Sequence, residues 1–188
     1  QFLSNGGIGT IALVGDGYML CGINHRSDAK VTATMDMEYN FPTKTFHGVF
    51  DVDIIASPLD GGGQTTLHFD PDLWYVKVGE PSNRISLKLD DWLHTDAYFM
   101  VGQQLPTPQL PSEILELFPN YTVSRNPQIE SGSGFAFGAS SGFDTGRKPY
   151  LIFYGEVSAL VGFDLALLDY GEDTSCEGQT GSIGINGW

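Results

Sequence analysis

The sequence predicts an all-β domain of antiparallel strands, arranged as a sandwich, a barrel or a curled meander. Apolar and polar residues alternate with a period of two in several segments, and turns rich in glycine or proline separate these segments. Only the segment 112–118 is typical of a helix, so parallel strands joined by helices are not expected. The length of 188 residues, 41% of them hydrophobic, suits a single β-rich domain spanning 1–188.

The alternation is clearest in the segment 31–39, where apolar residues take every odd position and Thr, Asp or Glu every even one. The segment 46–54 repeats this design, with Asp51 and Asp53 on its polar side, and Pro42 separates the two. Both segments are therefore predicted to be strands with one buried face.

Turn residues delimit the strands that follow. Pro58 and the Asp-Gly-Gly-Gly run at 60–63 predict a break in the chain before the next strand. Further strands are predicted at 65–69, 74–78, 84–89, 96–101, 135–139 and 151–168. The last of these is long enough to need a bend or bulge near Gly155 or Gly162. The glycine-rich opening at 7–12 is expected to be flexible or tightly turned.

The charge balance argues against a nucleic-acid binder. The formal net charge is −14, from 23 acidic residues against 9 Lys and Arg, which leaves too few cations to neutralise phosphates or to bind an anionic membrane. The apolar stretch at 8–20 is interrupted by glycine and aspartate, so no membrane insertion is expected. An acidic surface suits an extracellular or cell-surface location, where calcium is abundant.

The two cysteines and the two chain ends bear on the origin of the chain. Cys21 and Cys176 could form one disulfide in an oxidising compartment, and two inert thiols are the alternative. The chain begins at Gln1 without methionine and stops after an Asn-Gly turn at Trp188. We therefore expect a fragment of a longer chain.

A possible nucleophile motif occurs at 138–142, where Gly-Ala-Ser-Ser-Gly fits the G-x-S-x-G pattern of serine hydrolases. That chemistry needs a helix after the serine and a histidine further along the chain. The residues after Gly142 cannot form such a helix, and all four histidines lie upstream. No catalytic residues are therefore assigned.

Paired carboxylates are the candidate metal ligands, and solvated strand faces and turns are their simplest interpretation. Asp60, Asp70 and Asp72 are the candidates for a calcium site, because calcium needs several converging oxygens. A carbohydrate-active enzyme would instead use two carboxylates from Asp51, Asp53, Asp70 and Asp72 beside Trp74. In that case the carboxylates should line one deep cleft.

Trp74, Trp92 and His68 are the candidate binding residues, since indole rings can stack on sugars. About two-thirds of the main aromatic residues are expected to be buried in the core, and an exposed aromatic row would instead indicate carbohydrate or protein recognition. His47 and His68 form no metal motif in the sequence, but adjacent strands could bring them together with Asp51.

Several stretches carry a resemblance. They are Gly162–Leu165, Cys176–Gly178 and Ile183–Trp188, together with Trp74–Gly79 and Tyr98–Gly102. The chain resembles, over about half its length, large uncharacterised secreted or surface proteins of Bacteroidetes-type bacteria. The resemblance implies a secreted or surface location and a chain that continues beyond Trp188, and it implies no catalytic role.

Together these features predict a structural or binding module of a secreted or cell-surface assembly, with no evident catalysis and with calcium as the one cofactor considered. Its partner would be another protein or the rest of a longer chain, bound through a strand edge or a sheet face. The alternative is a carbohydrate-active enzyme or a calcium-dependent carbohydrate-binding domain near Trp74.

Overall fold

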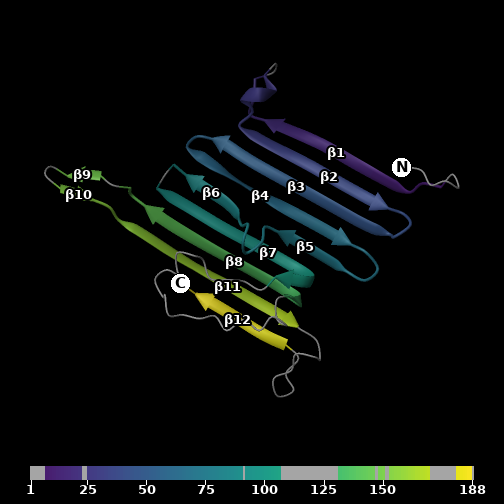
Figure 1. Ribbon diagram of the computed structural model, residues 1–188. Coiled ribbons are helices and arrows are strands. Elements are labelled where there is room, and N and C mark those ends of the chain that lie inside the picture. The colour runs from purple at the N-terminus through teal and green to yellow at the C-terminus, as the bar shows by residue number, and fades with distance from the viewer. Residues whose placement is uncertain are drawn as a thin grey trace.

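The computed structural model confirms the all-β, antiparallel prediction (Figure 1). It describes residues 7–22, 25–90, 92–106, 131–146, 148–150, 153–169 and 181–187. Within these ranges the only helix is a single 3-10 turn, η1 (Arg26–Asp28). The predicted helix at 112–118 lies outside the described residues.

The described strands form one ten-stranded sheet and a separate two-stranded hairpin. The strands of the large sheet are β1 (Thr10–Met19), β2 (Val31–Asn40), β3 (Thr45–Ala56), β4 (Leu59–Phe69), β5 (Trp74–Val78), β6 (Ile85–Leu89), β7 (Leu93–Pro106), β8 (Ser131–Asp144), β11 (Ser158–Asp169) and β12 (Gly181–Gly187). The hairpin pairs β9 (Lys148–Tyr150) with β10 (Phe153–Gly155). Neighbours in the large sheet follow the chain order, so the sheet is a meander with β1 and β12 at its edges.

β5 and β6 share one position in the sheet, between β4 and β7. β5 pairs with the last part of β4, and β6 pairs with its first part. Between them the chain leaves the sheet as an excursion from Gly79 to Arg84, closed by a bridge between Glu80 and Asn83. Gly79 has a φ of 69°, a left-handed conformation that glycine adopts without strain, and this is where the excursion begins.

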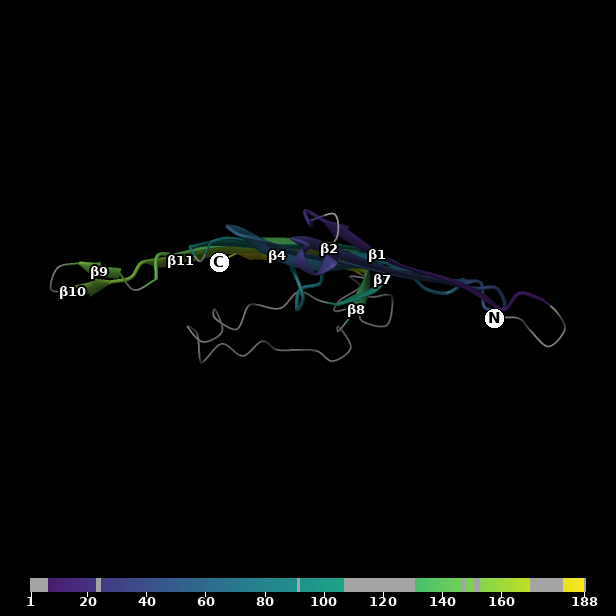
Figure 2. The same ribbon diagram turned by 90° about the horizontal axis from the view of Figure 1, so that it is seen from above.

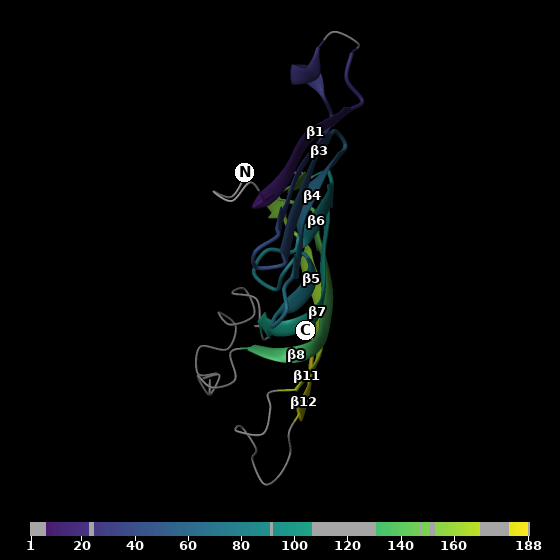
Figure 3. The same ribbon diagram turned by 90° about the vertical axis from the view of Figure 1, so that its right-hand side faces the viewer.

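The large sheet is a single layer. Figure 2 shows it edge-on, and Figure 3 shows that it is twisted and gently curved. No second sheet lies against it among the residues that the structure describes, because the other sheet there is the β9–β10 hairpin. Of the three expected arrangements, the curled meander is therefore the one that the described strands follow.

Glycine has a different role here from the one that the sequence predicted. The run Gly61–Gly63 does not break the chain but lies inside β4. A side chain at Gly61 would meet the backbone of Ser86, and one at Gly63 would meet Ile85. These glycines let β6 lie close beside β4, so the prediction of a break there was wrong.

Two other glycine-rich segments are also strands. The opening segment 7–12 was expected to be flexible or turned, but its residues Thr10, Ile11 and Ala12 belong to β1, whose pairing with β2 is regular over ten residue pairs. The G-x-S-x-G match at 138–142 lies in the middle of β8, which pairs with strands on both sides. A nucleophile elbow needs a sharp strand-to-helix turn, so this segment does not form one.

The buried core is small and lies under one face of β7, β8 and β11. It consists of Tyr98, Met100, Leu105, Ala136, Ala166 and Leu168. Tyr98 is buried, whereas Trp74, Trp92 and Phe99 are 42%, 43% and 44% exposed. The expectation that two-thirds of the aromatic residues would be buried was wrong for these, because a single-layer sheet leaves one face without cover.

Candidate functional site

The register of the strands places side chains of opposite character on the two faces of the large sheet. We call one face the apolar face. In β3 and β5 its residues are the even-numbered ones, and in the other strands they are the odd-numbered ones. These other strands are β1, β2, β4, β6, β7 up to Val101, β8 from Phe135 to Phe143 and β11 from Ala159 to Leu167. None of these residues is Asp, Glu, Lys, Arg or His. We call the opposite side the polar face, and it carries every charged residue of these strand segments.

Exposed apolar side chains occur on the apolar face from β1 to β11. Leu13 in β1, Trp74 in β5 and Phe163 in β11 are 53%, 42% and 44% exposed, although they lie on strands far apart in the sheet. The face crosses eight strand positions, and therefore seven strand spacings, and carries about five residues along each position. With strands about 4.8 Å apart and about 6.8 Å between alternate residues, its area is on the order of 1,100 Å². The largest apolar patch of an ordinary monomer is about 300–600 Å².

The apolar face is not flat, because large and small side chains alternate along some strands. On β7 and β8, Phe99 pairs with Phe137, and two residues further along Ala97 pairs with Ala139. The small residues form the floor of an open groove of about 630 Å³. Leu87 of β6 lines one side of this groove and Phe163 of β11 the other.

On the polar face, one row of directly paired side chains crosses four strands. Glu38 of β2 pairs with His47 of β3, His47 with His68 of β4, and His68 with Tyr75 of β5. The His47 and His68 rings lie 5.7 Å apart between centroids, and His68 stacks on Tyr75 at 5.3 Å. The proposed meeting of His47 and His68 across adjacent strands is thus confirmed. Asp51 lies four residues along β3 from His47, so it does not join them.

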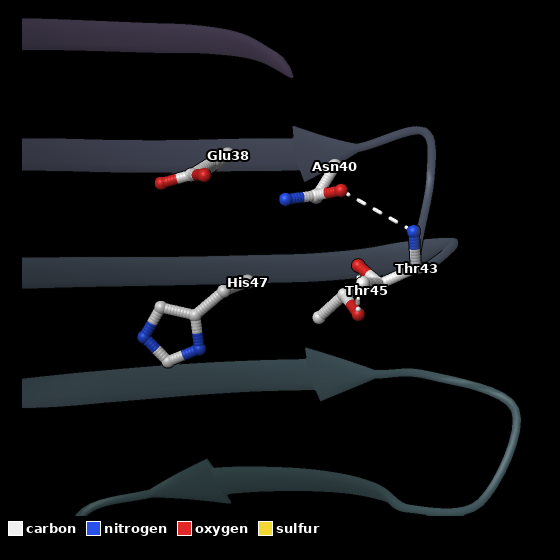
Figure 4. Close-up of a pocket in the computed structure, with 5 residues that line it drawn as sticks. All are labelled: Glu38, Asn40, Thr43, Thr45 and His47. Atoms are coloured by element: carbon white, nitrogen blue, oxygen red, sulfur yellow. Dashed lines mark hydrogen bonds between the residues drawn. The ribbon is translucent and has the colours of Figure 1, made fainter. Parts of the chain in front are cut away.

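A shallow hollow of about 220 Å³ lies beside His47, where β2 ends and β3 begins (Figure 4). Its polar walls are formed by Glu38, Asn40, Thr43, Thr45 and His47. The Asn40 side chain accepts a hydrogen bond from the Thr43 backbone N–H at 3.3 Å, which fixes the β2–β3 turn. This amide therefore has a structural role in the turn.

Asp70 is engaged in local hydrogen bonds at the end of β4. Its Oδ2 lies 2.9 Å from His68 Nε2, and its Oδ1 accepts the backbone N–H groups of Asp72 and Leu73 at 2.8 and 2.7 Å. The hydrogen bond from His68, and then those from the two backbone groups, lower the pKa of Asp70 below its ordinary value. This carboxylate closes the turn between β4 and β5.

The three candidate calcium ligands do not converge. Asp60 is the second residue of β4, and Asp70 follows its last residue, so about 33 Å of extended strand separates them. Asp72 lies in the turn beside Asp70 and contributes its backbone N–H there. Among the described residues, no three His, Cys, Asp or Glu side chains are grouped so as to hold a metal ion.

The carboxylates considered for an enzyme lie in two separate places. Asp51 and Asp53 line an open polar hollow of about 310 Å³ on the polar face, where Asp51 accepts a hydrogen bond from Gln64 Nε2 at 3.2 Å. Asp70 is six residues along β4 from Gln64, which is about 20 Å. Trp74 lies on the apolar face, so the sheet separates it from Asp51 and Asp53.

Trp92 and Cys21 lie at strand ends. Trp92 is in the turn between β6 and β7, and its ring contacts Phe143 edge to face, 5.8 Å between centroids. The Cys21 thiol is free and half-buried, and Cys176 lies outside the described residues.

A buried ion pair on the polar face was not predicted from the sequence. Arg84, at the end of the excursion, donates to both carboxylate oxygens of Asp164 on β11, at 3.0 and 3.2 Å. The Asp164 side chain is fully buried, and the Arg84 guanidinium lies 5.1 Å above the Tyr98 ring. The pair therefore ties the excursion across β7 and β8 to β11.

Burial dominates the electrostatics of this cluster. It raises the pKa of Asp164, and the Arg84 charge offsets part of that effect. Burial, together with the nearby Asp164 charge, raises the pKa of Tyr98 far above its ordinary value. Gly138 lies between Tyr98 and Asp164 in the sheet, and any side chain there would collide with both. The signal available in the sequence was Asp164, a single charged residue inside an otherwise apolar strand segment.

Comparisons with protein families, with curated proteins and with solved structures found no match. Among the described residues, no helix has the length and apolar character needed to cross a membrane.

Proposed function

We propose that this chain is a structural module of a secreted or cell-surface assembly, and that it acts by packing its apolar face against a second apolar layer. The observation that carries this proposal is the complete separation of charge between the two faces of the large sheet. An antiparallel sheet with this pattern is stable when its polar face meets water and its apolar face packs against other apolar groups.

The energetic cost of leaving the apolar face bare supports the same proposal. At about 25 cal/mol per Å² of apolar surface, covering an area on the order of 1,100 Å² would stabilise the protein by about 25 kcal/mol or more before ordering costs. The acidity of the chain and the stretches that resemble secreted proteins support the extracellular setting.

Adjacent residues of β2 give a matched pair of variants for the test. Ala33 lies on the apolar face and Thr34 on the polar face, where its neighbours on β1 and β3 are Asp16 and Asp51. Lysine at position 34 remains in water between two acidic groups and should change the free energy of unfolding by less than about 0.5 kcal/mol. Lysine at position 33 would place a charge under the cover.

If the face is covered in the purified chain, Ala33→Lys should lower the free energy of unfolding by more than about 2 kcal/mol. If it is uncovered because the cover is missing from the sample, the wild-type chain should bind a hydrophobic fluorescent dye strongly. A wild-type chain that binds no dye and tolerates both lysines equally would contradict the proposal.

A further inference from the structure

We propose that the layer covering the apolar face is the apolar face of a second copy of this chain. This inference rests on the proposed function and names its partner. Two copies would bury on the order of 2,200 Å² in all, within the range of obligate homodimers and above the roughly 1,600 Å² of an average stable complex. The absence of charge on the face matches the apolar interior of such interfaces.

The relief of the face is complementary to itself over β7 and β8. Along β7, Phe99 stands two residues from Ala97, and along β8, Phe137 stands two residues from Ala139. The paired residues Phe99 and Phe137 form one row across the two strands, and Ala97 and Ala139 form the next row. We place a two-fold axis in the plane of the interface, perpendicular to the strands and midway between these two rows. This axis lays each strand of one copy antiparallel over the same strand of the other copy. Phe99 and Phe137 of one copy then enter the groove floored by Ala97 and Ala139 of the other.

The same axis relates other large and small residues. On β2 it brings Met35 of one copy over Ala33 of the other, and on β8 it brings Phe135 over Ser141. One axis therefore relates large to small side chains on strands that are not neighbours. Two sheets with interdigitating side chains pack about 10 Å apart, and both polar faces, each with its small core over β7, β8 and β11, lie on the outside. The sandwich that the sequence suggested would form between two copies.

A lipid surface is the other material that suits an uncharged face, and the edges of the sheet argue against it. β1 has a neighbouring strand on one side only within the described part of the chain. Backbone groups along a free strand edge need hydrogen-bond partners, which hydrocarbon does not provide. Water provides them at the edge of a sandwich.

The test is a swap of residue size within one chain, read by light scattering on the purified 188-residue protein. The wild type should have a mass of about 41 kDa, twice the 20.4 kDa of one chain. Ala97→Phe should weaken dimerisation at least about 10-fold, because the new ring meets Phe99 of the other copy. Circular dichroism checks that the variant keeps its strands.

The double variant Ala97→Phe/Phe99→Ala exchanges the two sizes and should restore the 41 kDa species. This rescue requires a partner that itself carries both exchanged residues, because position 97 of one copy packs against position 99 of the other. The exchange conserves the total side-chain volume of the face. Thr34→Phe, on the polar face, is the matched control and should stay dimeric. A dimer that tolerates Ala97→Phe, or a double variant that is no better than the single one, would overturn the proposed packing.

A monomeric wild type would overturn the second copy as partner, and its other properties would show whether the proposed function falls with it. A monomer that binds hydrophobic dye, or that floats with phosphatidylcholine vesicles, keeps an apolar face in need of cover, so only the partner is wrong. A monomer that does neither contradicts the proposed function as well.

Discussion

The buried ion pair between Arg84 and Asp164 gives the sharpest single-residue prediction. Arg84→Met keeps most of the aliphatic length of the side chain but removes its charge, which leaves the carboxylate buried without its cation. At 3.0 Å and an effective dielectric constant of about 20, the lost attraction is about 5.5 kcal/mol. The contact above Tyr98 adds about 0.5–1 kcal/mol. Partial hydration of the carboxylate returns some of this, so we expect a loss of about 3–5 kcal/mol at neutral pH.

Urea unfolding followed by circular dichroism measures this loss. Lys77→Met is the control, because Lys77 and Glu80 form a partly exposed pair at 2.9 Å beside the same excursion, and such pairs contribute less than about 1 kcal/mol. Arg84→Met/Asp164→Leu should recover part of the loss, because it removes both charges. If Arg84→Met costs no more than Lys77→Met, the pair does not hold the excursion to β11.

The pH dependence of this loss has a definite sign. Burial raises the pKa of Asp164 above 3.8, and removal of Arg84 raises it further. The folded variant then binds a proton more readily than the unfolded chain, so its stability falls as pH rises above 3.8 through the raised pKa. The cost of Arg84→Met should therefore be smaller near pH 4 than at neutral pH. A cost that does not change with pH would contradict this.

The other predictions concern single positions on the strands and turns. Gly138→Ala should lower the free energy of unfolding by more than about 2 kcal/mol, because its methyl group would collide with Tyr98 and Asp164. Gly15→Ala is the control: only the end of the Met35 side chain lies nearby, so the free energy of unfolding should change by less than about 0.5 kcal/mol. Equal effects of the two variants in thermal melts would refute the close packing around Gly138. Asp70 has a lowered pKa, so the stability that it contributes is present above 3.8 and is lost as pH falls through the folded-state value. The difference in melting temperature between the wild type and Asp70→Asn should accordingly disappear in acid. A difference that grows in acid would contradict the role of the Asp70 carboxylate in stabilising the turn between β4 and β5.

The strands that the sequence predicted are those in which one face is polar. In the segments 31–39 and 46–54, each apolar residue has a charged or hydroxyl-bearing neighbour, and this produces a clear period of two. β1 lacks that contrast, because Gly15, Asp16 and Gly17 interrupt its apolar residues. Gly61–Gly63 suggested a break, because a glycine that makes room for a neighbouring strand looks the same in sequence as a glycine that makes a turn.

Contacts in the candidate site could be predicted from the sequence only where they join residues on consecutive strands. His47 and His68 lie on consecutive strands, so their meeting could be proposed before the register was known. Arg84 and Asp164 are 80 residues apart, and their contact depends on the excursion crossing two strands. The burial of Trp74 and Phe99 was overestimated, because the pattern of alternation shows which face is apolar but not what covers it.

The cover of the apolar face is tested most directly by the oxidation of methionine with hydrogen peroxide, followed by mass spectrometry of peptides. Met35 and Met37 lie on the apolar face in β2, whereas Met100 lies in the small core on the polar face and is fully buried. If a second layer covers the face, Met35 and Met37 should oxidise as slowly as Met100, and Ala33→Lys should speed their oxidation without affecting Met100. Oxidation of Met35 and Met37 in the wild type at the rate of the unfolded chain, with Met100 protected, would show that the face is bare in the purified chain and would contradict a second copy as its cover.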